Sequence, residues 1–79
     1  MSLELDLRGK RADEVALELD RYLNDASLAH VTQVRIIHGF GTGTVRQIVR
    51  DVLSSHPLVQ SSRPGQKGEG GDGVTIVIM

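Results

Sequence analysis

Two short stretches of the chain carry residue types that can act on a phosphate ester. The stretch "DLRG" contains Asp6 and Arg8, and the stretch "IHGFGTG" contains His38. A histidine exchanges protons near neutral pH, and a carboxylate or a histidine can activate water. An arginine can bind a phosphate at two points and offset charge in a transition state. These three are the candidate catalytic residues; the alternatives are a solvent-facing carboxylate, a surface ion pair and a histidine that braces its own loop.

The glycines after His38 decide what kind of phosphate site this can be. They follow the pattern G-x-G-x-G at Gly39, Gly41 and Gly43. A P-loop requires a lysine after its last glycine, and a dinucleotide fingerprint requires G-x-G-x-x-G in a larger unit, so neither cofactor motif fits. What remains is a loop whose backbone can approach an anion closely before a helix begins. The alternative is a tight turn that needs positive φ angles.

The net charge of −1 rules out a globally basic nucleic-acid binder. Cations nevertheless gather in the predicted loops and helix starts, where a local positive patch can attract an anion. The candidate residues for binding phosphate or nucleic acid are Lys10, Arg11, Gly39, Gly41, Thr42, Gly43, Arg46 and Lys67.

Length and composition narrow the class of protein. The 79 residues fit a single domain over residues 1–79, which we expect to be part of a longer protein. The lack of cysteine excludes disulfides, zinc fingers and a thiol nucleophile. No apolar run approaches the ~20 residues of a membrane span, so no membrane partner is expected. Tyr22 and Phe40 are the only aromatic residues, which argues against a platform of aromatic rings for stacking bases.

Carboxylates that could hold a metal ion are sparse. A two-metal phosphodiesterase site needs several clustered carboxylates. Only Asp6 is clearly placed, while Glu69 and Asp72 lie in a glycine-rich loop from which they could swing in. The sequence therefore predicts one weakly held divalent cation, magnesium or manganese, or none.

Hydrophobic periodicity predicts six elements. Strict alternation predicts a strand over residues 3–7, and a 3.6-residue period predicts a helix over 11–28. A β-branched run predicts a strand over 31–37. A second helix is expected from a capping box formed by Thr44 and Gln47 to the stop at His56-Pro57. A weak strand over 58–62 and a strong one over 74–79 flank the glycine-rich loop.

The order β-α-β-α-β-β predicts an α/β fold with a four-stranded mixed sheet. Strands separated by a helix are normally parallel, and the last two strands can form an antiparallel hairpin. Glu4 and Asp6 share one face of the first strand, which favours a two-layer sandwich with one sheet face free of helices. The carboxyl ends of parallel strands meet at one edge of a sheet, so Asp6, Arg8 and His38 are expected to converge there.

Three motifs in order resemble the Smr (small MutS-related) domain family, in the version found at the C-terminus of bacterial second-type MutS proteins. They are "LDLRG" (5–9), "HGFGTG" (38–43) and "EGGDGVTIVIM" (69–79), and the resemblance covers essentially the whole chain. The family motif L-D-x-[HR] falls on Leu5, Asp6 and Arg8, and H-G-x-G falls on His38, Gly39 and Gly41. Many stand-alone members carry histidine at the position of Arg8, so a mechanism with two histidines does not fit this chain.

The resemblance implies a two-layer α/β sandwich similar to the C-terminal domain of translation initiation factor three. It also implies an endonuclease that nicks DNA, branched DNA in some members, or cuts RNA in others. The parent bacterial proteins are cytoplasmic ATPases linked to suppression of recombination or to stalled ribosomes. The expected partners are thus DNA, RNA or the ribosome, and the remainder of a larger ATPase chain.

Three functions remain open at the level of the sequence. The first is a phosphodiesterase in which Asp6 or His38 activates water or protonates the leaving oxygen. The second is a non-catalytic module that binds nucleic acid or the ribosome through the same loop. The third is a docking domain whose bare sheet face meets another domain or chain.

Overall fold

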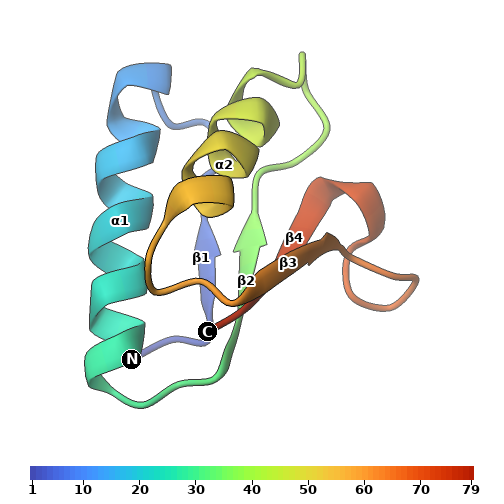
Figure 1. Ribbon diagram of the computed structural model, residues 1–79. Coiled ribbons are helices and arrows are strands. Elements are labelled where there is room, and N and C mark those ends of the chain that lie inside the picture. Colours follow the sequence, from blue (N-terminus) through green and yellow to red (C-terminus); the bar gives the residue numbers. More distant parts are fainter.

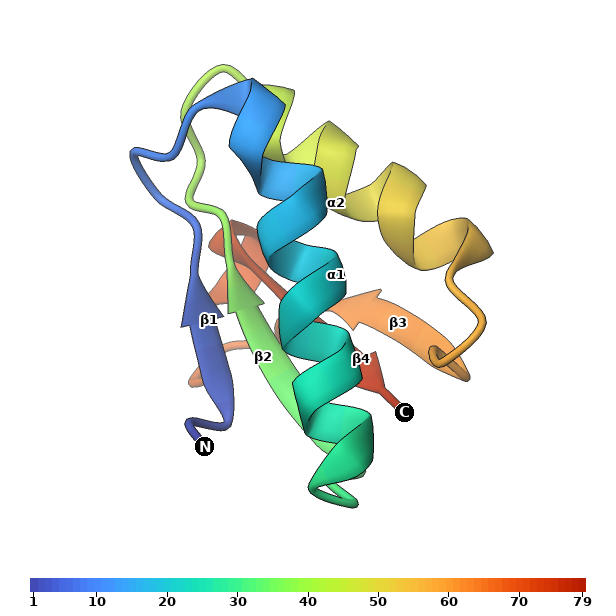
Figure 2. The same ribbon diagram turned by 90° about the vertical axis from the view of Figure 1, so that its left-hand side faces the viewer.

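The computed structural model describes residues 1–79 as two helices packed on one face of a four-stranded sheet (Figures 1 and 2). This confirms the predicted two-layer α/β class and the order of elements. Neither helix has the length and apolar character required to cross a membrane. The elements are β1 (Glu4–Asp6), α1 (Ala12–Leu28), β2 (Gln33–Ile37), α2 (Thr44–Ser55), β3 (Ser61–Pro64), the 3-10 turn η1 (Gly71–Gly73) and β4 (Val74–Ile78).

The strands lie in the order β1-β2-β4-β3. β1 and β2 are parallel, with Asp6 opposite Ile37, and β4 is antiparallel to both of its neighbours. The predicted parallel pair and the predicted final hairpin are both confirmed. Since β1 and β2 end side by side, the segments that follow them leave the sheet at the same edge.

The core lies between the sheet and the helices and is wholly aliphatic. Of the apolar residues that recur at helical spacing on α1, Val15, Leu19, Leu23 and Ala26 are buried, whereas Ala12 and Ala16 are exposed. Each large side chain that is fully buried contributes about 1.5–3 kcal/mol of transfer free energy. The remaining core residues are Leu7, Val34, Ile36, Val49, Leu53 and Val77.

The first strand is shorter than predicted. Leu3 was expected to share the buried face of Leu5 and Leu7, but its side chain is 61% exposed. Its carbonyl still accepts the N–H of Arg35, so the backbone is paired there. The side-chain packing of β1 against the core begins only at Leu5.

The predicted capping box of α2 is wrong. The N-cap residue is Gly43 in the left-handed region, at φ 86°, and no side chain caps the helix. The Thr44 hydroxyl is bonded to that of Thr42 at 3.0 Å, and the Gln47 amide donates to Asp51 instead. A capping box needs its hydroxyl residue at the N-cap position, which the glycine occupies here. The predicted stop is confirmed, because α2 ends at Ser55 and His56 is extended.

The third strand lies further along the chain than the predicted range of 58–62. Val59 packs against the core from a turn, and β3 begins only at Ser61. All residues of β3 are exposed, so no alternating pattern marks it. β3 is an edge strand, and this position tolerates Pro64 because its missing N–H faces no partner.

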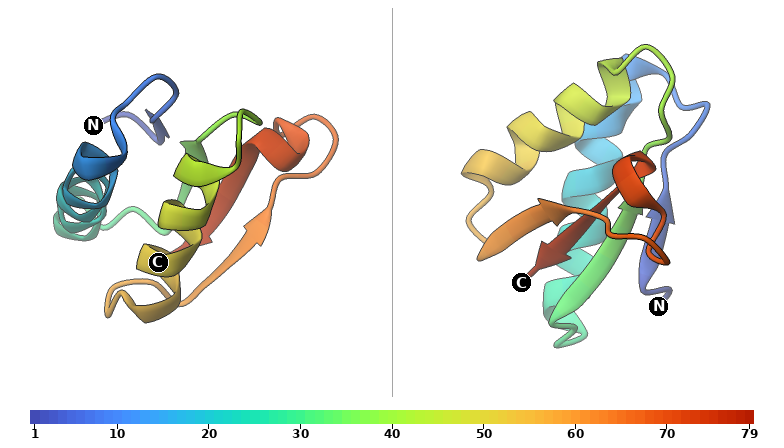
Figure 3. Two further views of the ribbon diagram at one scale, coloured as in Figure 1. Left: turned by 90° about the horizontal axis from the view of Figure 1, so that it is seen from above. Right: turned by 90° about the vertical axis from the view of Figure 1, so that its right-hand side faces the viewer.

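The sheet face opposite the helices is partly covered by the glycine-rich segment 65–73 (Figure 3). Val74 and Ile76 lie outside the core cluster, yet they are only 4% and 2% exposed. Arg63 and Glu69 form a two-point ion pair at 2.7 and 2.9 Å that fixes this segment against β3. The expected helix-free face is confirmed, but part of it is covered by the chain itself.

Candidate phosphate-binding site

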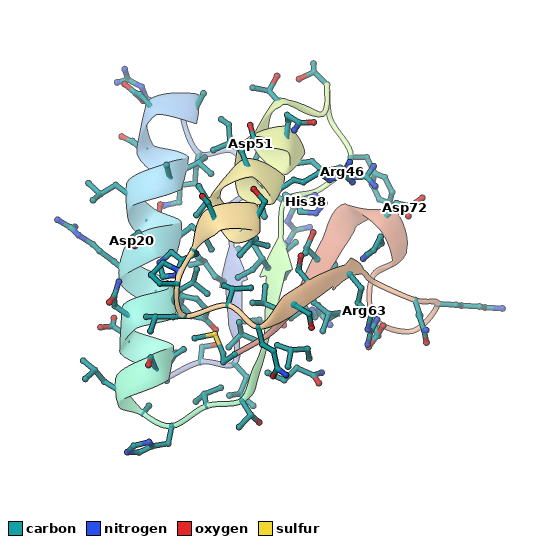
Figure 4. All side chains as sticks on the ribbon, in the orientation of Figure 1. Asp20, His38, Arg46, Asp51, Arg63 and Asp72 are labelled. Atoms are coloured by element: carbon teal, nitrogen blue, oxygen red, sulfur yellow. The ribbon has the colours of Figure 1, made fainter.

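A pocket lies where β1 and β2 end and α2 begins. Its walls are Arg8 and Gly9 after β1, His38 after β2, and the loop and first turn of α2 over residues 39–46. Figure 4 shows His38 beyond the end of β2 and Arg46 close to it on the first turn of α2. The predicted convergence of Arg8 and His38 at this edge is therefore present in the structure.

The backbone of this loop offers a continuous run of free hydrogen-bond donors. No hydrogen bond within the chain uses the N–H groups of residues 40–46. The glycines at 39, 41 and 43 all have positive φ angles, which lets the loop turn tightly into the helix. The partial positive charge of a helix N-terminus adds to these donors. Such an array suits a phosphate or another oxyanion.

Asp6 reaches the pocket only through Arg8. Arg8 donates from Nη2 to Oδ2 of Asp6 at 2.7 Å and from Nε to Oδ1 at 3.0 Å, and its backbone N–H also donates to Oδ1. These bonds lower the pKa of Asp6 to about 2. Asp6 is not part of the pocket wall. A carboxylate with so low a pKa is a weak base. Its hydrogen bonds to Arg8 suit it instead to positioning the guanidinium.

The stem of Arg8 rests on the glycine loop. A Cβ at Gly39 would lie 3.2 Å from Cγ of Arg8 and 3.4 Å from its Cδ. Glycine at this position thus allows the arginine to cross the loop closely. Asp6 therefore binds the guanidinium of Arg8, and Gly39 lies against the aliphatic part of the same side chain.

His38 is held by hydrogen bonds at both ring nitrogens and is 6% exposed. Nδ1 lies 2.9 Å from the carbonyl of Gly39, and Nε2 lies 2.9 Å from the hydroxyl of Thr75. A carbonyl can only accept, so we assign the proton to Nδ1; in the neutral ring Nε2 then accepts from Thr75. The ring can exchange a proton with a ligand only through Nε2, once the hydroxyl of Thr75 turns away.

Several other predicted residues lie outside the pocket wall. Lys10 is paired with Glu18 at 3.5 Å, and Arg11 with Asp13 at 2.9 Å. Lys67 is exposed in the glycine-rich segment and does not line the pocket. The pocket thus contains Gly39, Gly41, Thr42, Gly43 and Arg46 of the predicted binding set, but not these three cations.

The donor set does not fit a metal ion held by the protein alone. No three His, Asp or Glu side chains lie close enough together to share one. Glu69, which was expected to swing in, is bound by Arg63, and this ion pair lowers its pKa to about 2. Asp6 is likewise occupied by Arg8.

Three residues of the site were missed at the level of the sequence. Phe40 is 71% exposed at the rim of the pocket, and Thr75 binds His38 across the sheet. The third is Arg50, which lines a groove between α2 and β3 together with Thr75 and the predicted Arg46. Neither arginine has an acidic partner. The four-residue spacing of the two arginines on a predicted helix was a usable signal for Arg50. No signal identified Thr75, because its role depends on strand pairing.

Comparison with known proteins shows the family of the chain. The sequence model of the Smr domain matches residues 5–79. The chain is 52% identical over 77 residues to endonuclease MutS2 of Caldicellulosiruptor saccharolyticus and 53% identical to putative endonuclease MutS2 of Bacillus subtilis. Each match includes 98% of this chain but only 10% of the relative.

Solved structures support the same assignment. The Smr domain of Thermus thermophilus MutS2 superposes with a TM-score of 0.91 at 41% identity, over 95% of this chain and 94% of that one. YdaL, a stand-alone small MutS-related protein from Escherichia coli, superposes with a TM-score of 0.92 over 98% of this chain and 63% of that one. At 24% identity the second comparison concerns the fold alone.

Proposed function

The chain belongs to the Smr domain family, and from this premise we propose that it is an endonuclease domain that cuts phosphodiester bonds in DNA or RNA. Relatives that bear the name endonuclease MutS2 support the reaction class. Because the chain spans a tenth of their length, we also propose that it acts as one part of a longer chain. The family resemblance implies that the remainder of that chain includes an ATPase.

The free backbone N–H groups of residues 40–46, which line one pocket together with Arg8, carry this proposal. A phosphodiester placed in the pocket accepts hydrogen bonds from the loop and from the first turn of α2. Arg8, fixed by Asp6, offsets the negative charge that builds up on the phosphoryl oxygens in the transition state. Asp6 is a positioning residue in this scheme.

The chemical step is hydrolysis. A water oxygen bonds to phosphorus, and the bond from phosphorus to the leaving oxygen breaks. His38 takes up the proton of the attacking water at Nε2 after Thr75 releases that atom, and a proton from solvent neutralises the leaving oxygen.

A second candidate is a binding module without catalysis. Both ring nitrogens of His38 are occupied by protein partners, and no carboxylate cluster surrounds the pocket. In this case the loop and the arginines bind a phosphate backbone, and binding weakens as salt is added.

Cleavage assays separate the two candidates. The chain, Asp6→Asn and His38→Ala are incubated with supercoiled plasmid and with structured RNA, each with magnesium, with manganese and with chelator. Arg21→Gln, which changes an exposed arginine on α1 that has no ion-pair partner and lines no part of the pocket, is the control. Cutting by the chain and the control that both site variants lose supports the endonuclease. Salt-dependent binding without cutting under any condition favours the binding module, and equal cutting by all proteins overturns the assigned residues.

A further inference from the structure

Phe40 is an exposed phenyl ring at the rim of the phosphate-binding pocket. Its side chain is 71% exposed, in a chain whose core contains only aliphatic residues. Phe40 lines two pockets. One is the pocket with Arg8 and His38, and the other is also lined by Arg35 and Val74. Leu3, Leu17 and Leu28 are exposed apolar residues too, but they do not line this pocket; its place at the rim of the pocket sets Phe40 apart.

The ring does not hang freely from the loop. A Cβ at Gly73 would lie 3.0 Å from Cε2 of Phe40 and 3.3 Å from its Cζ, so one edge of the ring packs on the backbone at Gly73. The carbonyl of the same Gly73 accepts the N–H groups of His38 and Gly39 at 3.1 and 2.9 Å. The backbone beneath the ring is therefore bonded to the loop that forms the pocket, which holds the ring in a fixed relation to it.

We propose that Phe40 stacks on an unpaired nucleobase next to the phosphate bound in the pocket, and that it selects strands with unpaired bases. This inference rests on the proposed function, because it assumes that the pocket takes a phosphodiester. The free N–H of Phe40 belongs to the phosphate-binding run, so its backbone and its ring meet neighbouring parts of one strand. A base inside a duplex is covered on both faces by its neighbours and offers no face to the ring. Stacking accepts any base, in DNA or in RNA.

The chain has no tryptophan, so Phe40→Trp places a single fluorescent reporter at the rim. The ligands are a single-stranded DNA, a single-stranded RNA, a hairpin in which every base is paired because its loop consists of abasic sites, and the single strand with its bases replaced by abasic sites. Intact strands are verified on a gel after each titration. We expect single strands of either kind to quench the tryptophan, and the paired hairpin and the abasic strand to leave it unchanged. Leu28→Trp, at an 80% exposed position on α1, is the control that should not respond.

A second variant tests the energy of the contact. Phe40→Leu keeps an apolar side chain but removes the ring, and we expect single-strand affinity to fall about tenfold. Affinity for the paired hairpin should stay within twofold, and Phe40→Tyr should restore single-strand binding.

The possible failures are distinguishable. Salt-dependent binding of both ligands without quenching of the tryptophan overturns the role of Phe40 and leaves the proposed function standing. Equal loss of single-strand and hairpin affinity in Phe40→Leu also overturns it, since the ring is then a general contact. If no nucleic acid binds even at low salt, the inference and the proposed function fail together.

Discussion

Nε2 of His38 lies 2.9 Å from the hydroxyl of Thr75, so the histidine that follows β2 is hydrogen-bonded to the neighbouring strand β4. The backbone N–H of His38 is bonded to Gly73, directly before the same strand. β4 and the residue directly before it thus hold both the ring and the main chain of His38, and the glycine loop over residues 39–43 begins from a fixed point.

The first prediction concerns this hydrogen bond. Thr75→Val keeps the shape of the side chain but removes the hydroxyl, which leaves Nε2 of a nearly buried ring without its partner. We expect a loss of stability of about 1 kcal/mol in urea unfolding, the usual net value of one hydrogen bond. We also expect the pH dependence of cleavage to shift relative to the unaltered chain, while Thr75→Ser, which keeps the hydroxyl, should retain the original profile. An unchanged profile in Thr75→Val would show that His38 acts independently of Thr75.

The second prediction follows from the low pKa of Asp6. The ion pair with Arg8 depresses the folded-state pKa from 3.8 to about 2, so the ionised carboxylate is favoured in the folded protein. The resulting stabilisation is present above pH 3.8 and is lost as the pH falls from 3.8 towards 2. Between pH 5 and 8 this pair should leave stability independent of pH.

Carbon-detected NMR titration of the side-chain carboxyls measures this pKa directly. In Arg8→Gln the midpoint of Asp6 should rise from about 2 towards 3.8, while that of Glu69, which is bound by Arg63, should stay near 2. The ion pair of Asp6 and Arg8 is at the surface, so Arg8→Gln should not alter overall stability greatly. A midpoint near 3.8 in the unaltered chain would mean that the pair does not form in solution.

Periodic, locally determined features of the fold could be predicted from the sequence. The helical spacing of Val15, Leu19 and Leu23 predicted α1, because this spacing places the three apolar side chains on one face of a helix. The predicted range of 11–28 differs from the observed one by a single residue. The His56-Pro57 pair fixes the end of α2 for a local steric reason. Ser61–Pro64 could not be recognised as β3, since an edge strand exposed along its whole length shows no alternation.

The candidate site was predictable only in part. Parallel strands ending at one edge were enough to bring Arg8 and His38 into one pocket. The contact between His38 and Thr75 depends on the register of two strands far apart in sequence, which no local pattern encodes. Asp6 was expected to face the ligand, but its carboxylate is bound by Arg8, two residues later in the chain. At the level of the sequence, Phe40 was used only as one of two aromatic residues. Its exposure at the rim of the pocket could not be predicted, because composition does not show where a loop side chain lies.

The third prediction separates steric from backbone effects in the glycine-rich segment. Gly68 and Gly70 both have positive φ angles, 92° and 110°, so alanine is strained at either position by roughly 1–2 kcal/mol. Only at Gly70 would the new Cβ overlap Cγ2 of Val74, while nothing lies near it at Gly68. We expect Gly70→Ala to lower the free energy of unfolding by about 1–3 kcal/mol more than Gly68→Ala, the usual range for overpacking. Urea denaturation of the two variants side by side measures the difference, and equal losses would show that Val74 moves aside without cost.

The fourth prediction tests whether a bound strand extends beyond the pocket. Arg46 lines both the candidate phosphate-binding pocket and the groove between α2 and β3, and Arg50 follows one helical turn later in that groove. Neither has an acidic partner within ion-pair distance, so both guanidinium groups are available to a second phosphate. If the strand follows this groove, Arg50→Gln removes one phosphate contact. The slope of log affinity against log salt should then fall by about 0.7 for a single strand.

Arg21→Gln is the matched control for this measurement, because it removes the same charge from an exposed arginine that also lacks an ion-pair partner, on α1. Fluorescence anisotropy of a labelled strand at several salt concentrations gives both slopes. A purely global effect of charge would weaken binding equally in the two variants, since each lowers the net charge by one. A changed slope in Arg50→Gln alone requires a local contact, and it would fix the direction in which the strand leaves the pocket as towards β3.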